Sequence, residues 1–148
     1  METKNHNFKF FKTSGSTIFQ NNYHIVFSTK YRRKIIGPIL TKELKDIYGE
    51  IAEEKPYGIE MLGIGIEVDH IHIVVSVPPG TSIAKAVQKL KGYPSFKIFK
   101  KYPELSEKIG KRALWQTGYF CRSVGDMNIP QIMAYLDKQR DVEYLGDR

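Results

Sequence analysis

Two histidines one residue apart are the clearest chemical feature of this sequence. His70 and His72 flank Ile71 in a segment whose other alternate residues are apolar. Because successive side chains of a strand point to opposite faces, both imidazoles lie on one face and the apolar residues on the other. Two neighbouring imidazoles are suited to bind one divalent ion. The nearby Glu67 and Asp69 are candidates to orient an imidazole N–H as supporting partners.

The histidine pair is either ordinary polar surface or part of a metal site, and a metal site needs further ligands. Tyr135 and Gln139 are four residues apart, so in a helix they share a face. A glutamine carbonyl is a hard oxygen ligand that suits Mg²⁺ or Mn²⁺, and a phenolic oxygen can act as a nucleophile. Tyr135 also falls in an apolar stripe with Ile132 and Leu136, and its spacing alone favours core packing.

The charge balance of the chain favours an anionic partner. The 148 residues carry a net charge of +7, and nucleic acid is the commonest partner of a small basic domain. The candidate DNA-binding residues, in two basic clusters with interleaved aromatics, are Lys30, Arg32, Arg33, Lys34, Lys89, Lys91 and Tyr93. We expect these residues to contact phosphates and bases of single-stranded DNA. The alternative is that they form a solvated lysine-rich face that binds nothing specific.

The composition indicates a cytoplasmic protein without a membrane span. Cys121 is the single cysteine and cannot form an intrachain disulfide. No basic-then-apolar signal segment begins the chain. The longest apolar stretch, residues 71–79, is far shorter than the ~20 residues that cross a bilayer.

The first half of the chain predicts a strand, a helix and a hairpin. Residues 22–29 are rich in β-branched and aromatic side chains, which is typical of a strand. Apolar residues at spacings of three and four predict a helix from Pro38 to before Pro56. Residues 58–68 and 71–77 then predict two strands in a tight hairpin, with interior glycines in the first that suggest a bulge.

The second half predicts two further helices and a fourth strand. Thr81 or Ser82 caps a helix that Gly92 and Pro94 interrupt before it continues through Phe99. Residues 114–124 predict the fourth strand. Asn128 and Pro130 then suit the start of a last helix, which carries the tyrosine and glutamine pair.

The order of these elements predicts an α+β fold, the ferredoxin-like split βαβ sandwich. Its antiparallel sheet has helices on one face and leaves the other face free, and a C-terminal helix carries the tyrosine. Residues 1–12 are expected to form a flexible N-terminal arm, and residues 13–148 a single domain. Such a fold hosts many unrelated activities, so it does not by itself identify a function.

Taken together, these motifs resemble the single-tyrosine HUH transposases, the TnpA type of the insertion-sequence 200/605 group. The resembling segments, in family order, are residues 23–33 (YHIVFSTKYRR), 68–79 (VDHIHIVVSVPP), 90–92 (LKG), 114–125 (LWQTGYFCRSVG) and 135–139 (YLDKQ). The sequence departs from the family pattern in two small ways. Val68 stands where a proline is expected, and Ile129 with Pro130 replaces a polar, acidic helix start.

The resemblance implies specific roles for the residues named above. His70, His72 and Gln139 would bind Mg²⁺ or Mn²⁺, and Tyr135 would be the nucleophile. The implied activity is cleavage and rejoining of single-stranded DNA at transposon ends through a 5′-phosphotyrosine intermediate. The implied substrate is DNA with hairpins near those ends, and the implied assembly is a homodimer.

Three alternatives remain open from the sequence. The first is a non-catalytic single-stranded nucleic-acid binder of the same fold, which predicts base-stacking aromatics on the free sheet face. The second is a domesticated relative whose catalytic residues look the same. The third is a metal phosphohydrolase that uses water and leaves Tyr135 idle.

Overall fold

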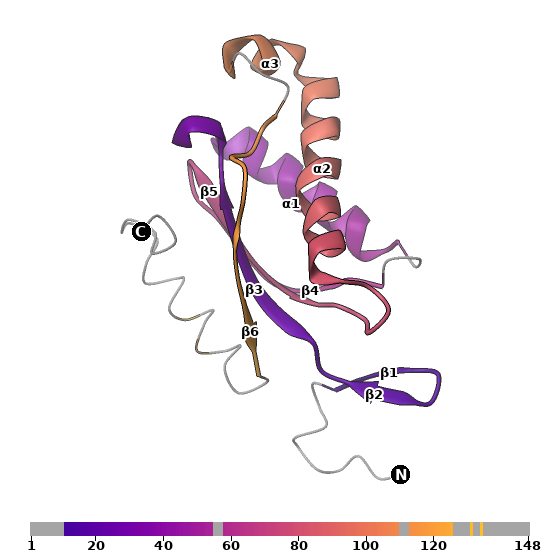
Figure 1. Cartoon of the computed structure of the whole chain (residues 1–148). Helices are drawn as coiled ribbons and strands as arrows, with labels where there is room; N and C mark the ends of the chain where they lie inside the picture. Colours follow the sequence, from indigo (N-terminus) through magenta and orange to yellow (C-terminus); the bar gives the residue numbers. More distant parts are fainter. Residues whose placement is uncertain (1–10, 55–57, 110–112, 126–130, 132–133, 135–148) are drawn as a thin grey trace.

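A four-stranded antiparallel sheet with two long helices on one face forms the centre of the molecule (Figure 1). This computed structural model describes residues 11–54, 58–109, 113–125, 131 and 134. The strands are β3 (Asn22–Ser28), β4 (Glu60–Ile66), β5 (His70–Ser76) and β6 (Phe120–Val124), in the spatial order β4-β5-β3-β6. This order is that of the split βαβ sandwich, so the predicted ferredoxin-like α+β fold is confirmed.

The helices α1 (Pro38–Ala52) and α2 (Ile83–Lys101) form where the sequence predicts them. Pro38 lies in the first turn of α1, and the residues that α1 buries at spacings of three and four are Leu40, Leu44, Ile47, Tyr48 and Ile51. The hydroxyl of Ser82 accepts a hydrogen bond from the Lys85 N–H at 3.0 Å and so caps α2. The hydrophobic core lies between these helices and the sheet.

The predicted break in the second helix is wrong, because α2 runs through Pro94 without interruption. A proline at this position cannot donate to the carbonyl of Leu90. The phenol of Tyr48 donates to that carbonyl instead, at 2.9 Å, and the indole N–H of Trp115 donates to the next carbonyl, that of Lys91, at 3.1 Å. The contact from Tyr48 thus satisfies the acceptor that Pro94 would otherwise leave without a partner.

The β4–β5 hairpin also has its predicted form. The N–H of Glu67 donates to the carbonyl of His70 at 2.8 Å, which closes a tight turn around Asp69. The register of β4 shifts between Met61 and Gly63, so the bulge that the interior glycines suggest is present.

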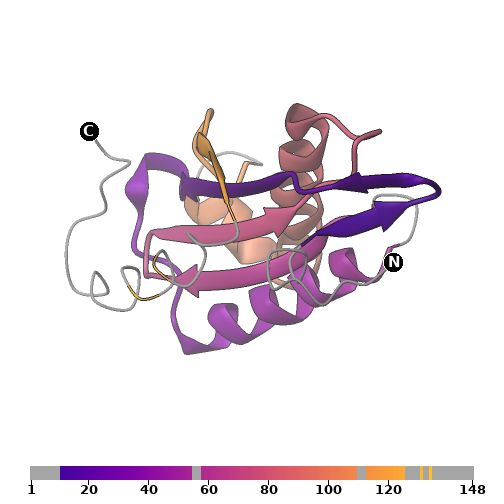
Figure 2. The ribbon, with the colours of Figure 1, turned by 90° about the horizontal axis from the view of Figure 1, so that it is seen from below.

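Four short elements of the structure do not appear in the sequence-based prediction. They are the β1 (Lys12–Ser14) and β2 (Thr17–Phe19) hairpin, the 3₁₀ turn η2 (Lys30–Arg32) and the helix α3 (Pro103–Ile109). The β1–β2 hairpin extends beyond the end of the sheet (Figures 1 and 2). Of the predicted arm, residues 1–10 lie outside the described residues, and Lys12 lies in β1.

The predicted fourth strand is shorter than expected. Within residues 114–124, only Phe120–Val124 forms β6, and Trp115 makes an isolated bridge to Thr29. Gly118 has a φ of +91°, a conformation that an L side chain rarely adopts, and it turns the chain between these two regions.

The predicted last helix lies largely outside the described residues, including Tyr135 and Gln139. Gln131 and Ala134 are described; both have helical backbone and are exposed. In the part of the chain that the structure describes, no helix has the length and apolar character needed to cross a bilayer.

Candidate metal centre

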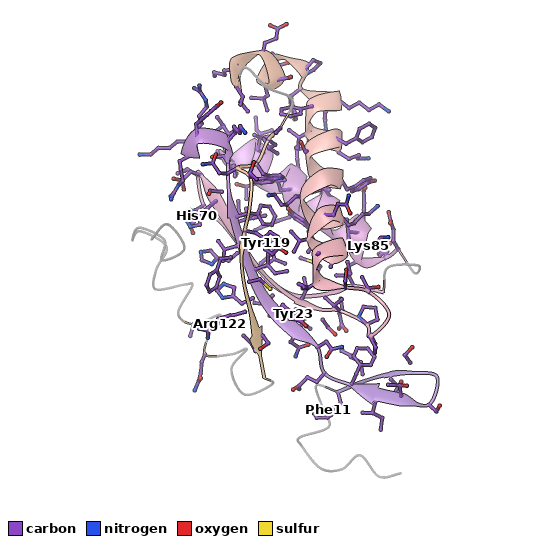
Figure 3. All side chains as sticks on the ribbon, in the orientation of Figure 1. Phe11, Tyr23, His70, Lys85, Tyr119 and Arg122 are labelled. Carbon is purple, nitrogen blue, oxygen red and sulfur yellow. The ribbon has the colours of Figure 1, made fainter. Side chains whose placement is uncertain are left out.

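The strand register gathers three histidines on the sheet face away from the helices. His70 and His72 lie on β5, and His24 lies on the adjacent strand β3, opposite Val74. Ile71 belongs to the hydrophobic core on the other face, so the predicted alternation of β5 is confirmed. In Figure 3 the His70 side chain lies on the side of the sheet away from α2.

All three imidazole rings are buried, with exposed fractions of 8% for His24, 5% for His70 and 6% for His72. The sheet face away from the helices is therefore not exposed to solvent at these three residues. The rings pack on one another: His24 and His72 are nearly parallel with centroids 5.4 Å apart, and His70 meets His72 edge-on at 5.1 Å. Phe120 contacts His24 edge-on at 6.0 Å.

A carboxylate supports the first histidine of the pair. Nδ1 of His70 lies 2.7 Å from Oδ1 of Asp69, and Oδ2 of Asp69 accepts from the guanidinium of Arg32 at 2.8 and 3.2 Å. This is the supporting contact expected of Asp69. Because Asp69 holds Nδ1, Nε2 is the ring nitrogen with which His70 would bind a metal.

Another histidine, His24, contacts His72, the second histidine of the pair. Nδ1 of His72 lies 3.2 Å from Nε2 of His24. The sequence-based prediction does not name His24 as a site residue. Its position in the strand formed by residues 22–28 indicates which residues of that strand share its face. Its contact with His72 depends on the β3–β5 register, which local sequence patterns do not report.

Burial keeps the three imidazoles neutral. It lowers the pKa of His72 to about 3, with smaller contributions from His70 and His24, and it lowers the pKa of His24 to about 4 together with the charge of Arg122. Burial also lowers the pKa of His70, although Asp69 opposes this shift. A neutral imidazole is the form that binds a metal ion.

Asp69 remains ionised. Its partial burial acts to raise its pKa, but the hydrogen bonds from His70 and Arg32 and the charge of Arg32 outweigh burial and hold the pKa below its usual value. An ionised carboxylate is the form that accepts a hydrogen bond from a metal-binding imidazole.

The donor set fits a divalent ion but is incomplete within the described residues. Two neutral imidazoles on one strand face are suitable ligands. Among residues that the structure describes, no group of three or more histidine, cysteine, aspartate or glutamate side chains could hold a metal ion. A further protein ligand would come from outside these residues, and the predicted ligand Gln139 lies outside the described residues.

The basic turn, residues 30–34, packs against Asp69 and is held in an uncommon conformation. Tyr31 and Arg32 have φ values of 59° and 54°, which few non-glycine residues adopt. The side chain of Gln116 accepts from the Tyr31 N–H at 3.0 Å, and Arg32 binds Asp69. Arg33 and Lys34 are exposed and remain available to a phosphate.

The predicted DNA-binding residues of α2 have partners inside the protein. Lys89 pairs with Glu54 at 3.1 Å, and the Tyr93 hydroxyl donates to Glu50 at 2.8 Å. Lys91 donates to the carbonyls of Gln116 and Gly118, at 2.8 and 2.9 Å. These contacts attach α2 to α1 and to the segment before β6, and DNA binding by these three residues stays a prediction.

Sequence comparisons link the chain to known transposases. The family model described as "Transposase IS200 like" matches residues 17–139. The ISDra2 transposase TnpA of Deinococcus radiodurans is 32% identical over 126 residues, which cover 85% of this chain and 89% of that protein. The transposase for insertion sequence element IS200 of Salmonella typhimurium is 28% identical over 137 residues, covering 93% of this chain and 88% of that protein.

Solved structures agree with this fold. A crystallised candidate transposase from Deinococcus radiodurans R1 superposes with a TM-score of 0.69 at 26% identity, covering 87% of this chain and 98% of that one. A REP-associated tyrosine transposase bound to a REP hairpin gives a TM-score of 0.55 at 11% identity, covering 84% of this chain and 72% of that one. At that low identity the second likeness supports the fold alone.

Proposed function

Because this chain belongs to the IS200-like transposase family, we propose that it cuts and rejoins single-stranded DNA with Tyr135 as nucleophile and a divalent metal as cofactor. The contact between Asp69 and His70, 2.7 Å long, is the observation that best supports a metal centre. An imidazole held by a carboxylate is the usual arrangement of a metal-binding histidine.

The proposed ligands are His70, His72 and Gln139, with Mg²⁺ or Mn²⁺ as the ion. When bound, the ion would draw charge from the nonbridging oxygens of a DNA phosphate. Asp69 holds the ring of His70, and both histidines are buried. The neutral state of both rings means that no proton must leave before a metal binds.

Tyr135 would act by transesterification. Its phenolic oxygen attacks the phosphorus, a P–O bond to tyrosine forms, and the bond to the 3′ oxygen breaks. The phenolic proton passes to solvent, and the leaving 3′ oxygen takes up a proton from solvent, so the leaving strand departs with a free 3′ hydroxyl. A second 3′ hydroxyl then attacks the 5′-phosphotyrosine and restores both the phosphodiester and the tyrosine. One ester replaces another, so no nucleotide needs to be hydrolysed.

The proposed substrate is a DNA hairpin near a transposon end, and the proposed setting is a homodimer in the cytoplasm. The REP-associated tyrosine transposase, bound to a REP hairpin, supports a hairpin substrate for this fold. The exposed Arg33 and Lys34 of the basic turn, close to the Asp69–His70 contact, support phosphate binding beside the metal centre.

The test is the formation of a covalent adduct between the protein and labelled single-stranded DNA from its own flanks. With Mg²⁺ or Mn²⁺ the wild-type protein should carry label through a denaturing gel. Tyr135→Phe should carry none, whereas the control Tyr144→Phe, on the same C-terminal segment, should behave as the wild type. An adduct with Tyr135→Phe would exclude this nucleophile, and cleavage that survives chelation would exclude the metal.

A non-catalytic single-stranded nucleic-acid binder is a second candidate, because Phe120 offers a stacking surface. Phe120 is 42% exposed and contacts His24 on the sheet face that carries the histidines. An aromatic side chain on such a face can stack on a base. Tight binding of single-stranded DNA, with no adduct under any metal condition, would favour this candidate.

A further inference from the structure

His24 lies beside His72 on the sheet face that carries the proposed metal ligands, and we infer that it is a positioning residue for His72. It holds the ring of His72 in the orientation and the tautomer that metal binding requires. This inference rests on the proposed function, since it takes His72 as a ligand.

The contact between the two rings is well defined. Nε2 of His24 and Nδ1 of His72 are 3.2 Å apart, and the ring planes are only 15° from parallel. In the β3–β5 register, His72 pairs with Val26 and His24 pairs with Val74, so the two histidines are diagonal neighbours on one face. Both are more than nine-tenths buried, and water competes little for this contact.

The position of one proton decides whether His72 can bind a metal. In a contact between two neutral imidazoles, one nitrogen donates an N–H and the other accepts with a lone pair. When His72 donates from Nδ1 to His24, its Nε2 carries a lone pair for a metal. The opposite arrangement places a proton on Nε2 of His72 and prevents coordination there. His24 therefore accepts the Nδ1 proton of His72 as Asp69 accepts that of His70, and each contact orients the ring.

His24 is not itself a ligand in this arrangement. The described residues contain no group of three metal-binding side chains, although His24, His70 and His72 lie together. Nε2 of His24 is directed at Nδ1 of His72, so its lone pair is used in that contact. Phe120 packs edge-on against the His24 ring and helps to fix its orientation.

Two substitutions of His24 distinguish the effect of its hydrogen bond from the effect of its volume. His24→Leu fills the site without an acceptor. In His24→Gln the amide oxygen reaches close to the position of Nε2 and can accept from His72. Mn²⁺ is titrated into each full-length protein without DNA, and free Mn²⁺ is followed by electron paramagnetic resonance. We expect affinity to fall roughly 10- to 100-fold in His24→Leu and to return to within a few-fold in His24→Gln.

A matched control and a spectroscopic reading complete the test. Tyr23→Phe alters the neighbouring residue, whose side chain packs toward the core, and should bind Mn²⁺ as the wild type does. Imidazole ¹⁵N shifts of the metal-free protein report the tautomer of His72. We expect the proton on Nδ1 in the wild type and a shift toward Nε2 in His24→Leu.

The possible outcomes are distinct. Unchanged Mn²⁺ affinity in His24→Leu, or a proton on Nε2 of His72 in the wild type, overturns the role of His24. Failure of the wild type to bind Mn²⁺, or of His72→Leu to weaken binding, overturns the proposed metal centre instead. If His24→Leu does not fold, the wild-type tautomer and the affinity of His24→Gln decide the question.

Discussion

Asp69 binds His70 and Arg32 at the same time, through its two carboxylate oxygens. Oδ1 lies 2.7 Å from Nδ1 of His70, and Oδ2 accepts from Nη2 of Arg32 at 2.8 Å. The basic turn, which Arg32 belongs to, is thereby attached to a candidate metal ligand. Loss of the Asp69 carboxylate should therefore affect both the basic turn and the orientation of His70.

Asp69→Ala should weaken Mn²⁺ binding by roughly 10- to 100-fold, because the His70 ring loses the group that orients it. Isothermal titration calorimetry of the metal alone measures this. Asp46→Ala is the control, since Asp46 is exposed on α1 and pairs only at 3.4 Å with Lys42. Equal affinities in the two variants would show that the carboxylate does not support the site.

Lys34→Gln should lower the affinity for single-stranded DNA and make it less sensitive to salt. Lys34 is exposed at the end of the basic turn, and each phosphate contact contributes about −0.7 to the slope of log affinity against log salt. Fluorescence anisotropy at several salt concentrations gives that slope. Lys42→Gln, an exposed lysine of α1, should leave the slope unchanged; the same change in both variants would argue against a contact at the turn.

Tyr48→Phe should destabilise the fold by about 1–3 kcal/mol, because the buried carbonyl of Leu90 loses its hydrogen-bond donor. Urea unfolding measures the difference. The control Tyr102→Phe removes a hydroxyl that donates to Glu43 nearer the surface, and it should cost less. Equal losses would mean that another group satisfies the carbonyl opposite Pro94.

The free energy of unfolding should fall as the pH decreases below about 6.5. Burial lowers the pKa of His24 to about 4 and of His72 to about 3, from an ordinary value of 6.5. Between these values the unfolded chain takes up protons that the folded protein does not, so stability is full above pH 6.5 and is lost toward pH 4 and below.

Each of these histidines adds a slope of at most ~1.4 kcal/mol per pH unit in that window. Urea unfolding at several values between about pH 7.5 and pH 4.5 measures the slope. His24→Gln removes one titrating group, so its slope should be smaller than that of the wild type. A stability that stays constant across this range would contradict the buried, neutral state of the rings.

The main elements of the fold follow from local patterns, and the exceptions have identifiable causes. The strands and helices around residues 22–90 form as their periodicity predicts, because that periodicity reflects which side faces the core. Pro94 is compatible with a helix here only because Tyr48 supplies a donor from α1. The fourth strand begins at Phe120, since Gly118 turns the chain before it.

The sequence by itself determined that His70 and His72 share a face, because the two-residue period of a strand is a property of the local backbone. Only the tertiary structure decided that these rings are buried and that His24, 48 residues from His72, lies against it. Such contacts depend on the register between strands distant in sequence and on the packing around them, and no local period encodes either.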